Sequence, residues 1–194
     1  MEIVSVDIGG THARFALHDP ATRVLSAHAT IAAAEHPDIE SAVRHYLRSV
    51  AATDISVAGF AVAAPASLDL IEFTNSPWRF RRTALERELK FTRLRIVNDF
   101  TALARGVPRI EPPGLHCLRP GVAVPDSPKA VIGPGTGLGV SGLIPRRDAA
   151  GARHWIALSG EGGHVSFAPT SELEIALLRF LTRGVNHYQQ VIEG

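Results

Sequence analysis

Residues that could handle phosphate stand together near the start of the chain. Residues 3–17 read IVSVDIGGTHARFAL, with Asp7, Gly9, Gly10 and Thr11 between two apolar runs. Such runs split by Gly-Gly predict a hairpin with a tight turn, because glycine takes positive φ without steric cost. The backbone N–H groups of such a turn form a concavity for anions, and a carboxylate beside it suits the cation of a polyphosphate. A surface hairpin whose Asp7 bonds its own turn is an equal alternative.

A second glycine turn carries the same residue types. Gly135-Thr136-Gly137 repeats the combination of glycine backbone and threonine hydroxyl, so two turns from separate units could hold one triphosphate. Residues 137–142 also satisfy G-x-G-x-x-G, which in a dinucleotide fold leads directly into a helix. Here the following residues read as a strand that runs into Pro145. We therefore discount dinucleotide binding, and the chain has no G-x-x-x-x-G-K-[ST] phosphate loop.

Two further groups could act on an alcohol. Asp99 follows an apolar strand, beside Asn98, and can be an ordinary helix N-cap or a base that accepts a hydroxyl proton. Glu161 and His164 form Glu-x-x-His, but the two glycines between them argue against a helix and hence against a di-metal site. In a loop this pair suits the hydroxyls of a polyol. A turn histidine bonded to backbone is the alternative.

The elements that must position these groups follow from hydrophobic periodicity. Apolar positions 39, 42, 43, 46, 47 and 50 form one helical stripe, which predicts a helix over residues 38–50. Residues 55–63 read as a strand covered on both faces, residues 24–31 and 94–97 as further strands, and residues 100–105 as a short helix. Thr83 and Glu86 form a capping-box pattern that predicts a helix ending near Lys90. The order indicates an α/β layer.

A proline-rich stretch, residues 106–128, predicts an interdomain connection. Strands are expected after it over residues 130–132, 140–144 and 153–158. Ser171 and Glu174 form a second capping box, opening a helix. The expected inner face of that helix is Leu173, Leu177, Phe180 and Leu181.

Composition narrows the class of protein. The chain has 194 residues, 45% of them hydrophobic, and a net charge of +1, so neither nucleic-acid binding nor electrostatic attachment to a membrane is expected. Cys117 is the single cysteine, which excludes an internal disulfide. No signal peptide is evident, and the longest apolar run falls short of the ~18 residues of a membrane span. The expected location is the cytoplasm.

Five ordered motifs resemble the bacterial glucokinases, within the superfamily of sugar kinases, actin and chaperone ATPases. They read VDIGGTHARFAL, TNSPW, IVNDFTALARGVP, IGPGTGLGVSGLIP and SGEGGHVSFAP. The resemblance implies a two-domain, actin-like (ribonuclease H-like) α/β fold with an incomplete second domain. The expected domains are residues 1–108 and 109–194. It also implies phosphorylation of glucose at the 6-hydroxyl by ATP with Mg²⁺.

The resemblance also assigns roles to residues. Asp99 matches the catalytic base, and Asp7 the metal ligand. The implied phosphate ligands are Asp7, Ile8, Gly9, Gly10, Thr11, Gly135, Thr136 and Gly137, and the implied sugar ligands are Asn75, Asn98, Asp99, Glu161, His164 and Gln189. His12 stands where the family usually has asparagine, and Gln189 where it has a glutamate. Family chains continue well beyond residue 194, through an adenosine-binding loop.

Two other functions stay open at this point. The chain could be a catalytically silent sugar-binding or regulatory domain without a complete nucleotide site. It could also be an actin-like ATPase, although such a protein needs no polyol loop. The sequence leaves a homodimer open as well, since an uncovered lobe would expose apolar surface.

Overall fold

The computed structural model describes residues 2–52, 54–73, 76–134, 137–160 and 162–183. These form two compact units, residues 1–102 and 103–194, which we describe separately. The domain boundary expected after residue 108 stays a prediction. The strands are β1 (Ile3–Ile8), β2 (His12–Asp19), β3 (Val24–Ala32), β4 (Val57–Val62), β5 (Leu70–Glu72), β6 (Arg79–Arg81), β7 (Arg93–Asn98), β8 (Lys129–Pro134), β9 (Leu138–Arg147) and β10 (Arg153–Leu158). The helices are α1 (Ile39–Ser49), α2 (Arg82–Glu88), α3 (Asp99–Gly106) and α4 (Glu172–Leu181).

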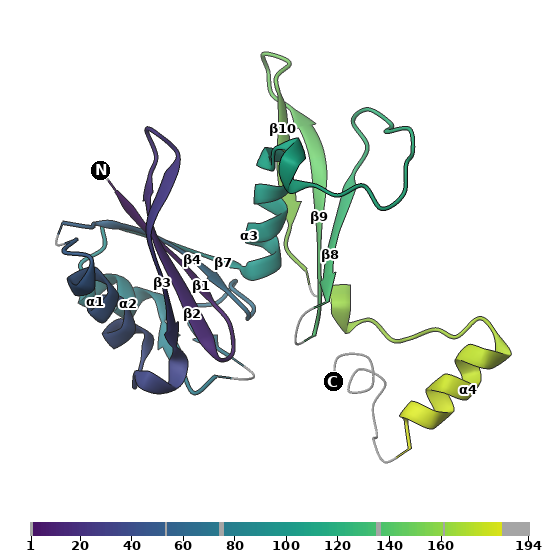
Figure 1. The fold of residues 1–194 in the computed structure, drawn as a ribbon, viewed down its shortest axis with the longest axis horizontal. Coiled ribbons are helices and arrows are strands. Elements are labelled where there is room, and N and C mark those ends of the chain that lie inside the picture. Colours follow the sequence, from purple (N-terminus) through teal and green to yellow (C-terminus); the bar gives the residue numbers. More distant parts are fainter. Residues whose placement is uncertain (1, 53, 74–75, 135–136, 161, 184–194) are drawn as a thin grey trace. The chain divides into compact units, whose positions relative to one another are not determined.

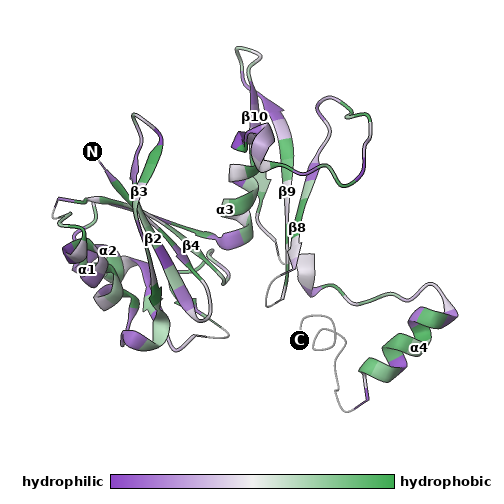
Figure 2. Cartoon of the chain, viewed as in Figure 1, coloured by the Kyte–Doolittle hydropathy of each residue, from purple (hydrophilic) through white to green (hydrophobic). Residues whose placement is uncertain are grey.

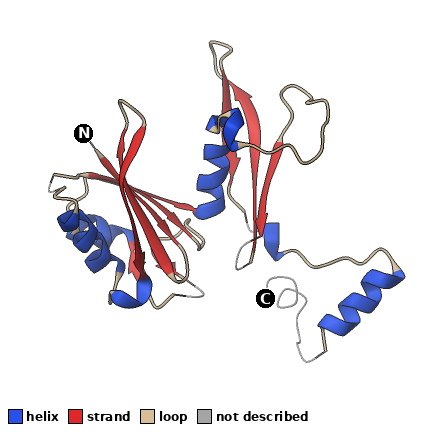
Figure 3. Ribbon diagram, in the orientation of Figure 1, coloured by secondary structure: helices blue, strands red, loops and turns tan. Residues whose placement is uncertain are grey.

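The first unit is built on a five-stranded sheet in the order β3-β2-β1-β4-β7 (Figure 3). β1 and β2 are antiparallel neighbours, and β1, β4 and β7 run parallel. The expected strands and the helix over residues 38–50 are confirmed in this order. Asp7 lies opposite Arg14 on β2 and opposite Ala61 on β4. The carboxyl ends of β1 and β7 lead into the first glycine turn and into α3.

Helices α1 and α2 cover one face of this sheet (Figure 1). The core joins alternate residues of the strands, such as Val6 and Phe15, to Val43 and Tyr46 of α1. The expectation that residues 55–63 are covered on both faces is wrong for the described structure. In β4 every second residue is buried and the residues between them are partly exposed. The partly exposed residues are Val57, Gly59 and Ala61. They are small and not charged, so the sequence did not distinguish their face from the core face.

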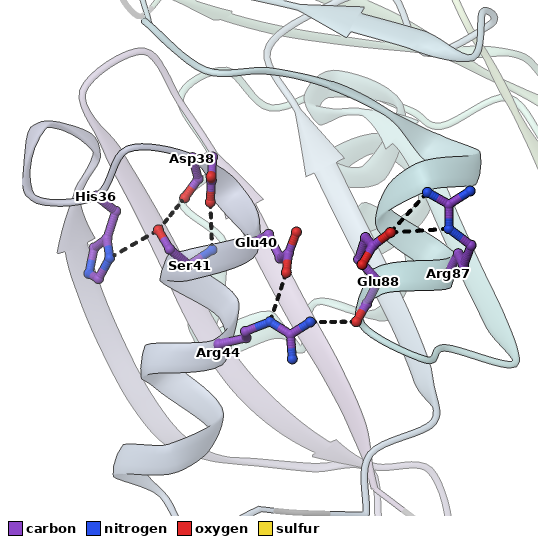
Figure 4. A network of polar contacts seen from close by, with 7 residues as sticks. All are labelled: His36, Asp38, Glu40, Ser41, Arg44, Arg87 and Glu88. Atoms are coloured by element: carbon purple, nitrogen blue, oxygen red, sulfur yellow. Dashed lines mark hydrogen bonds and ion pairs between the residues drawn. The ribbon is translucent and has the colours of Figure 1, made fainter.

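A polar network holds α1 in place (Figure 4). Asp38 caps the helix, because its Oδ1 accepts a hydrogen bond from the Ser41 N–H at 2.7 Å. Arg44 donates to Glu40 at 2.8 Å and also to the main-chain carbonyl of Glu88, the last residue of α2. Carbonyls at helix ends have no partner inside the helix, so this guanidinium satisfies one and links α1 to α2.

The capping box expected at Thr83 is wrong. Helix α2 begins at Arg82, so Thr83 already lies inside its first turn, and no side chain of the preceding residue caps it. The Thr83 N–H donates to Oδ1 of Asp69 at 3.0 Å. Glu86 instead accepts the N–H of Leu94 at 3.1 Å. A residue distant in sequence therefore provides the cap that the local pattern seemed to supply.

The second unit is built on the antiparallel sheet β10-β9-β8. Its core is small and consists of Ala104, Val131 and Leu143, with Trp155 among the partly buried residues around it. The capping box of Ser171 and Glu174 is confirmed at the start of α4. Helix α4 is strongly apolar (Figure 2), but its expected inner face is exposed, with Leu173 80% and Phe180 63% accessible. No helix in the described part of the chain is long and apolar enough to cross a membrane.

Candidate functional site

The first glycine turn joins β1 to β2. The Gly9 N–H donates to the His12 carbonyl at 3.0 Å, which leaves Gly10 and Thr11 as the two loop residues. The expected hairpin is therefore present, but neither glycine has a positive φ, so the expected reason for glycine is wrong here. The Thr11 hydroxyl lies 3.0 Å from Nδ1 of His12. The ring of His12 thus helps to orient the hydroxyl that the sequence predicts as a phosphate ligand.

Asp7 does not bond its own turn in the way that the alternative interpretation supposed. Its Oδ2 accepts a hydrogen bond from Nη1 of Arg14 at 3.0 Å across the β1–β2 pair. Both side chains are largely accessible, at 66% for Arg14 and 47% for Asp7. Such exposed ion pairs contribute roughly 0–1 kcal/mol to the free energy of folding. The pairing of Arg14 with Asp7 therefore adds little to the stability of the fold.

Asn98, not Asp99, makes the capping hydrogen bond of α3. Its Oδ1 accepts from the Thr101 N–H at 3.1 Å, which is the bond of an N-cap to the third helical residue. Asp99 accepts from the adjacent Phe100 N–H at 2.8 Å. Asn98 therefore fills the capping role that the sequence left open for Asp99, and the role of Asp99 as a base stays a prediction.

Burial is the largest influence on Asp99 and raises the pKa of its carboxyl above the ordinary value of 3.8. The Phe100 N–H bond lowers that pKa, and the negative charge of Asp7 raises it again. The side chain of Asn98 also hydrogen-bonds the carboxylate. A carboxylate whose charged form is disfavoured is a better proton acceptor, which is the property required of a general base.

Among the described residues, no group of three or more His, Cys, Asp or Glu could hold a metal ion. A magnesium ion that arrives with a polyphosphate needs only one or two protein carboxylates, since phosphate oxygens and water supply the other ligands. The partly exposed carboxylate of Asp7, at the end of the strand that enters the turn, fits such an ion. Ile8 points into the core and can offer only its backbone.

Gly137 and His164 lie in the second unit. His164 is exposed and ends a 3₁₀ turn, Gly162–His164, and Gly137 directly precedes β9. Gly163 joins the two regions: a Cβ on it would lie 1.6 Å from the carbonyl oxygen of Leu138. Only glycine allows this approach, so the turn that carries His164 is held against the start of β9. The discounted dinucleotide motif, residues 137–142, lies almost entirely inside β9 and leads into no helix.

A hollow of about 570 Å³ lies over β8–β10 and is lined largely by apolar groups, among them Val140, Gly142 and Leu158. Ser159 and Gly160 bound it, so it adjoins the loop that the sequence predicts for sugar. Among the described residues that line it, Lys129 is the single ionisable one.

Five of the predicted site residues, Asn75, Gly135, Thr136, Glu161 and Gln189, lie outside the described residues. In the first unit, Asp7 and Thr11 lie at the carboxyl end of β1, and Asn98 and Asp99 at the carboxyl end of β7, on either side of the parallel strand β4. Sequence reasoning passed over Arg14. Its position seven residues after Asp7, across a two-residue turn, was the available signal, since it makes the two residues cross-strand neighbours.

Comparisons with known proteins agree with one another. The family model described as Glucokinase matches residues 4–192. A curated protein named Glucokinase from Chromobacterium violaceum is 41% identical over 190 residues, covering 97% of this chain and 53% of that protein. The chain thus spans about half the length of the curated relatives it matches.

Two solved structures bear on the fold. The crystal structure of glucokinase from an Antarctic psychrotroph has a TM-score of 0.76 at 34% identity, covering 97% of this chain and 58% of that one. A ROK family glucokinase from Streptomyces griseus, in complex with glucose and AMPPNP, has a TM-score of 0.58 at 22% identity. That likeness covers 89% of this chain and 53% of that one. The expected sugar kinase fold class is confirmed.

Proposed function

The chain belongs to the glucokinase family, and from that premise we propose that it supplies the catalytic base, the phosphate turns and the sugar loop of a kinase that phosphorylates glucose with ATP. The observation that carries the proposal is Asp99: a half-buried carboxylate at the end of β7, whose pKa is raised by burial and by the negative charge of Asp7, the residue at the end of β1. A structural cap would not need this carboxylate, because Asn98 already caps α3.

In the proposed reaction Asp99 accepts the proton of the glucose 6-hydroxyl as its oxygen attacks the terminal phosphoryl group. Asn98 hydrogen-bonds the carboxylate and a sugar hydroxyl, so that the base stays oriented. The turn of Gly9, Gly10 and Thr11 holds phosphate oxygens through N–H and O–H donors. These donors stabilise the negative charge that develops during transfer.

Four other residues are proposed as sugar ligands: Asn75, Glu161, His164 and Gln189. Their roles rest on the resemblance of their motifs to the family, and His164 is exposed on its turn as a ligand must be. Gly135, Thr136 and Gly137 are proposed as further phosphate ligands on the same ground. The sugar in the Streptomyces griseus complex is glucose, which supports glucose as the substrate proposed here.

ATP and Mg²⁺ are the proposed nucleotide and metal. Mg²⁺ would be held by Asp7 and, when bound, would supply positive charge to the phosphoryl oxygens. The proposed location is the cytoplasm, in keeping with a single cysteine and no internal disulfide. A homodimer is the proposed assembly, supported by exposed apolar residues such as Leu173 and Phe180.

The test measures glucose 6-phosphate with a coupled dehydrogenase. It uses the 194-residue chain, and the same chain extended by the C-terminal half of the Chromobacterium violaceum relative. Formation of glucose 6-phosphate by the extended protein, dependent on Asp99, is the expected result. Glucose binding without turnover in both proteins would overturn the enzyme proposal in favour of a silent sugar-binding domain. ATP hydrolysis indifferent to glucose would favour an actin-like ATPase.

A further inference from the structure

Arg14 is the single arginine or lysine in residues 3–19, the hairpin that carries the first phosphate turn. The proposed function gives it no role. The turn itself offers only neutral donors, whereas the nearby side chains Asp7 and Asp99 are acidic. A triphosphate that approached these two carboxylates without a neighbouring cation would be repelled.

The geometry of Arg14 suits a phosphate ligand. It lies opposite Asp7 in the β1–β2 register, two residue pairs from the loop, and its side chain is 66% accessible. Its bond to Asp7 engages Nη1, and a guanidinium carries further donors on its other nitrogens. Arginine binds phosphate oxygens in a bidentate manner, with charge-assisted hydrogen bonds.

The ion pair also sets up a competition for Asp7. The carboxylate of Asp7, which accepts the hydrogen bond from Arg14, is also the proposed metal ligand. A cation bound at Asp7 weakens the attraction between Asp7 and Arg14, and the phosphates that arrive with that cation offer the guanidinium new acceptors. The exposed pair contributes little to folding, so exchange of partners costs little.

We propose that Arg14 is a phosphate-binding residue that pairs with Asp7 in the empty site and turns to the phosphates when Asp7 takes the metal. This inference rests on the proposed use of the first turn as a phosphate site. It makes two predictions of opposite sign for one substitution. Loss of Arg14 weakens binding of polyphosphate, and the same loss strengthens binding of a divalent cation in the absence of phosphate.

The experiment titrates the 194-residue chain and its variants with two probes: inorganic tripolyphosphate with Mg²⁺ by calorimetry, and Mn²⁺ alone by electron paramagnetic resonance. Arg14→Gln should weaken tripolyphosphate binding about 10-fold to 100-fold, the range for hydrogen bonds to charged groups. Arg14→Lys should restore part of it, since an ammonium keeps the charge but not the bidentate geometry. Mn²⁺ should bind Arg14→Gln a few-fold more tightly than wild type, and Asp7→Asn should abolish that binding.

The matched control is Arg95→Gln. Arg95 lies in β7, opposite Gly59 and in line with Ser5 of β1, so it shares the sheet face of Asp7 but not its position. The Arg95→Gln variant should bind both probes with affinities within about 2-fold of those of wild type. Circular dichroism and thermal unfolding, expected to be unchanged in Arg14→Gln, exclude misfolding as the cause.

Equal affinity of wild type and Arg14→Gln for both probes would overturn the inference, and so would weaker binding of both probes. Undetectable tripolyphosphate binding by wild type would also overturn it. Failure of the proposed function has a different signature: the opposite shifts are found, but the extended protein forms no glucose 6-phosphate. In that case the phosphate role of Arg14 stands and the kinase reaction falls.

Discussion

Asn98 and Asp99 adjoin at one strand end but make different contacts. Asn98 uses its side-chain oxygen for the helix start, and Asp99 keeps a half-buried carboxylate whose pKa is raised. From the sequence either residue could have been the cap. The distinction matters because a cap contributes to stability, whereas a base contributes to the rate of the reaction.

Replacement of Asp99 therefore separates the two contributions. Asp99→Asn and Asp99→Ala in the extended protein should lower kcat roughly 10²-fold to 10⁴-fold, the usual range for a positioned base. A cap would instead lose about 1 kcal/mol of stability on replacement by alanine, with kcat preserved. Coupled kinetics and urea unfolding measure the two effects. Normal turnover in Asp99→Asn would contradict the assignment.

The raised pKa of Asp99 also predicts the pH dependence of activity. The base acts only when ionised, so kcat/KM should rise with pH. The apparent pKa of this acidic limb should lie above the ordinary carboxyl value of 3.8. As a control, Asp69→Asn removes a carboxylate whose pKa is lowered by its bonds to Thr83, and the limb should not move. A limb at or below the ordinary value would show that the titrating group is not Asp99.

The same shift has a consequence for stability with the opposite pH trend. A raised folded-state pKa favours the protonated form, so its contribution is complete below the unfolded pKa and is lost as pH rises through the folded pKa. Ionised Asp99 thus lowers stability at neutral pH, and neutral Asp99→Asn should gain in unfolding free energy relative to wild type as pH rises.

At the scale of elements, a close backbone approach within the second unit fixes the turn that carries His164, a proposed sugar ligand. The 3₁₀ turn that carries His164 packs on the first residue of β9 because Gly163 has no side chain. Sequence reasoning attributed the paired glycines to a loop and to the absence of a helix. It could not find this contact, since Leu138 lies far from Gly163 along the chain.

Gly163→Ala should consequently displace the turn. A methyl group 1.6 Å from a carbonyl oxygen forces the backbone to move, with a cost of about 1–3 kcal/mol as in other overpacked sites. Glucose affinity of the extended protein, measured by calorimetry, should fall along with thermal stability. The matched control is Gly160→Ala, because nothing lies within 4 Å of an added Cβ there. Wild-type behaviour of Gly163→Ala would contradict the packing argument.

At the scale of the whole molecule, the two units differ in how much apolar surface they bury. The first has an extensive core that runs from Val4 through Phe60 to Trp78. The described part of the second buries Ala104, Val131 and Leu143 and leaves Ile132 63% exposed. Burial is the main source of folding free energy, so the units should not be equally stable.

Hydrogen exchange tests this difference directly. Amides of β1 and β4 should be the most protected, and those of β8 and β10 should exchange faster, because opening the smaller core exposes less apolar surface. Phe60→Ala should accelerate exchange in β1 and β4. The difference in amide protection between the two units should then become smaller. Equal protection of the two sheets in the wild-type chain would show that core size does not govern their stability.

The sequence by itself determined the order of the helices and of strands β1–β4 and β7–β10, the first hairpin, the cap at Ser171 and the family, but not the short strands β5 and β6. Each of these rests on residues within a few positions of one another, where turn chemistry and periodicity act. Tertiary structure decided that Asp69 caps α2, that Arg14 faces Asp7, that Gly163 meets Leu138 and that one face of β4 is partly exposed. Such contacts join distant residues, and only strand register and packing bring them within reach.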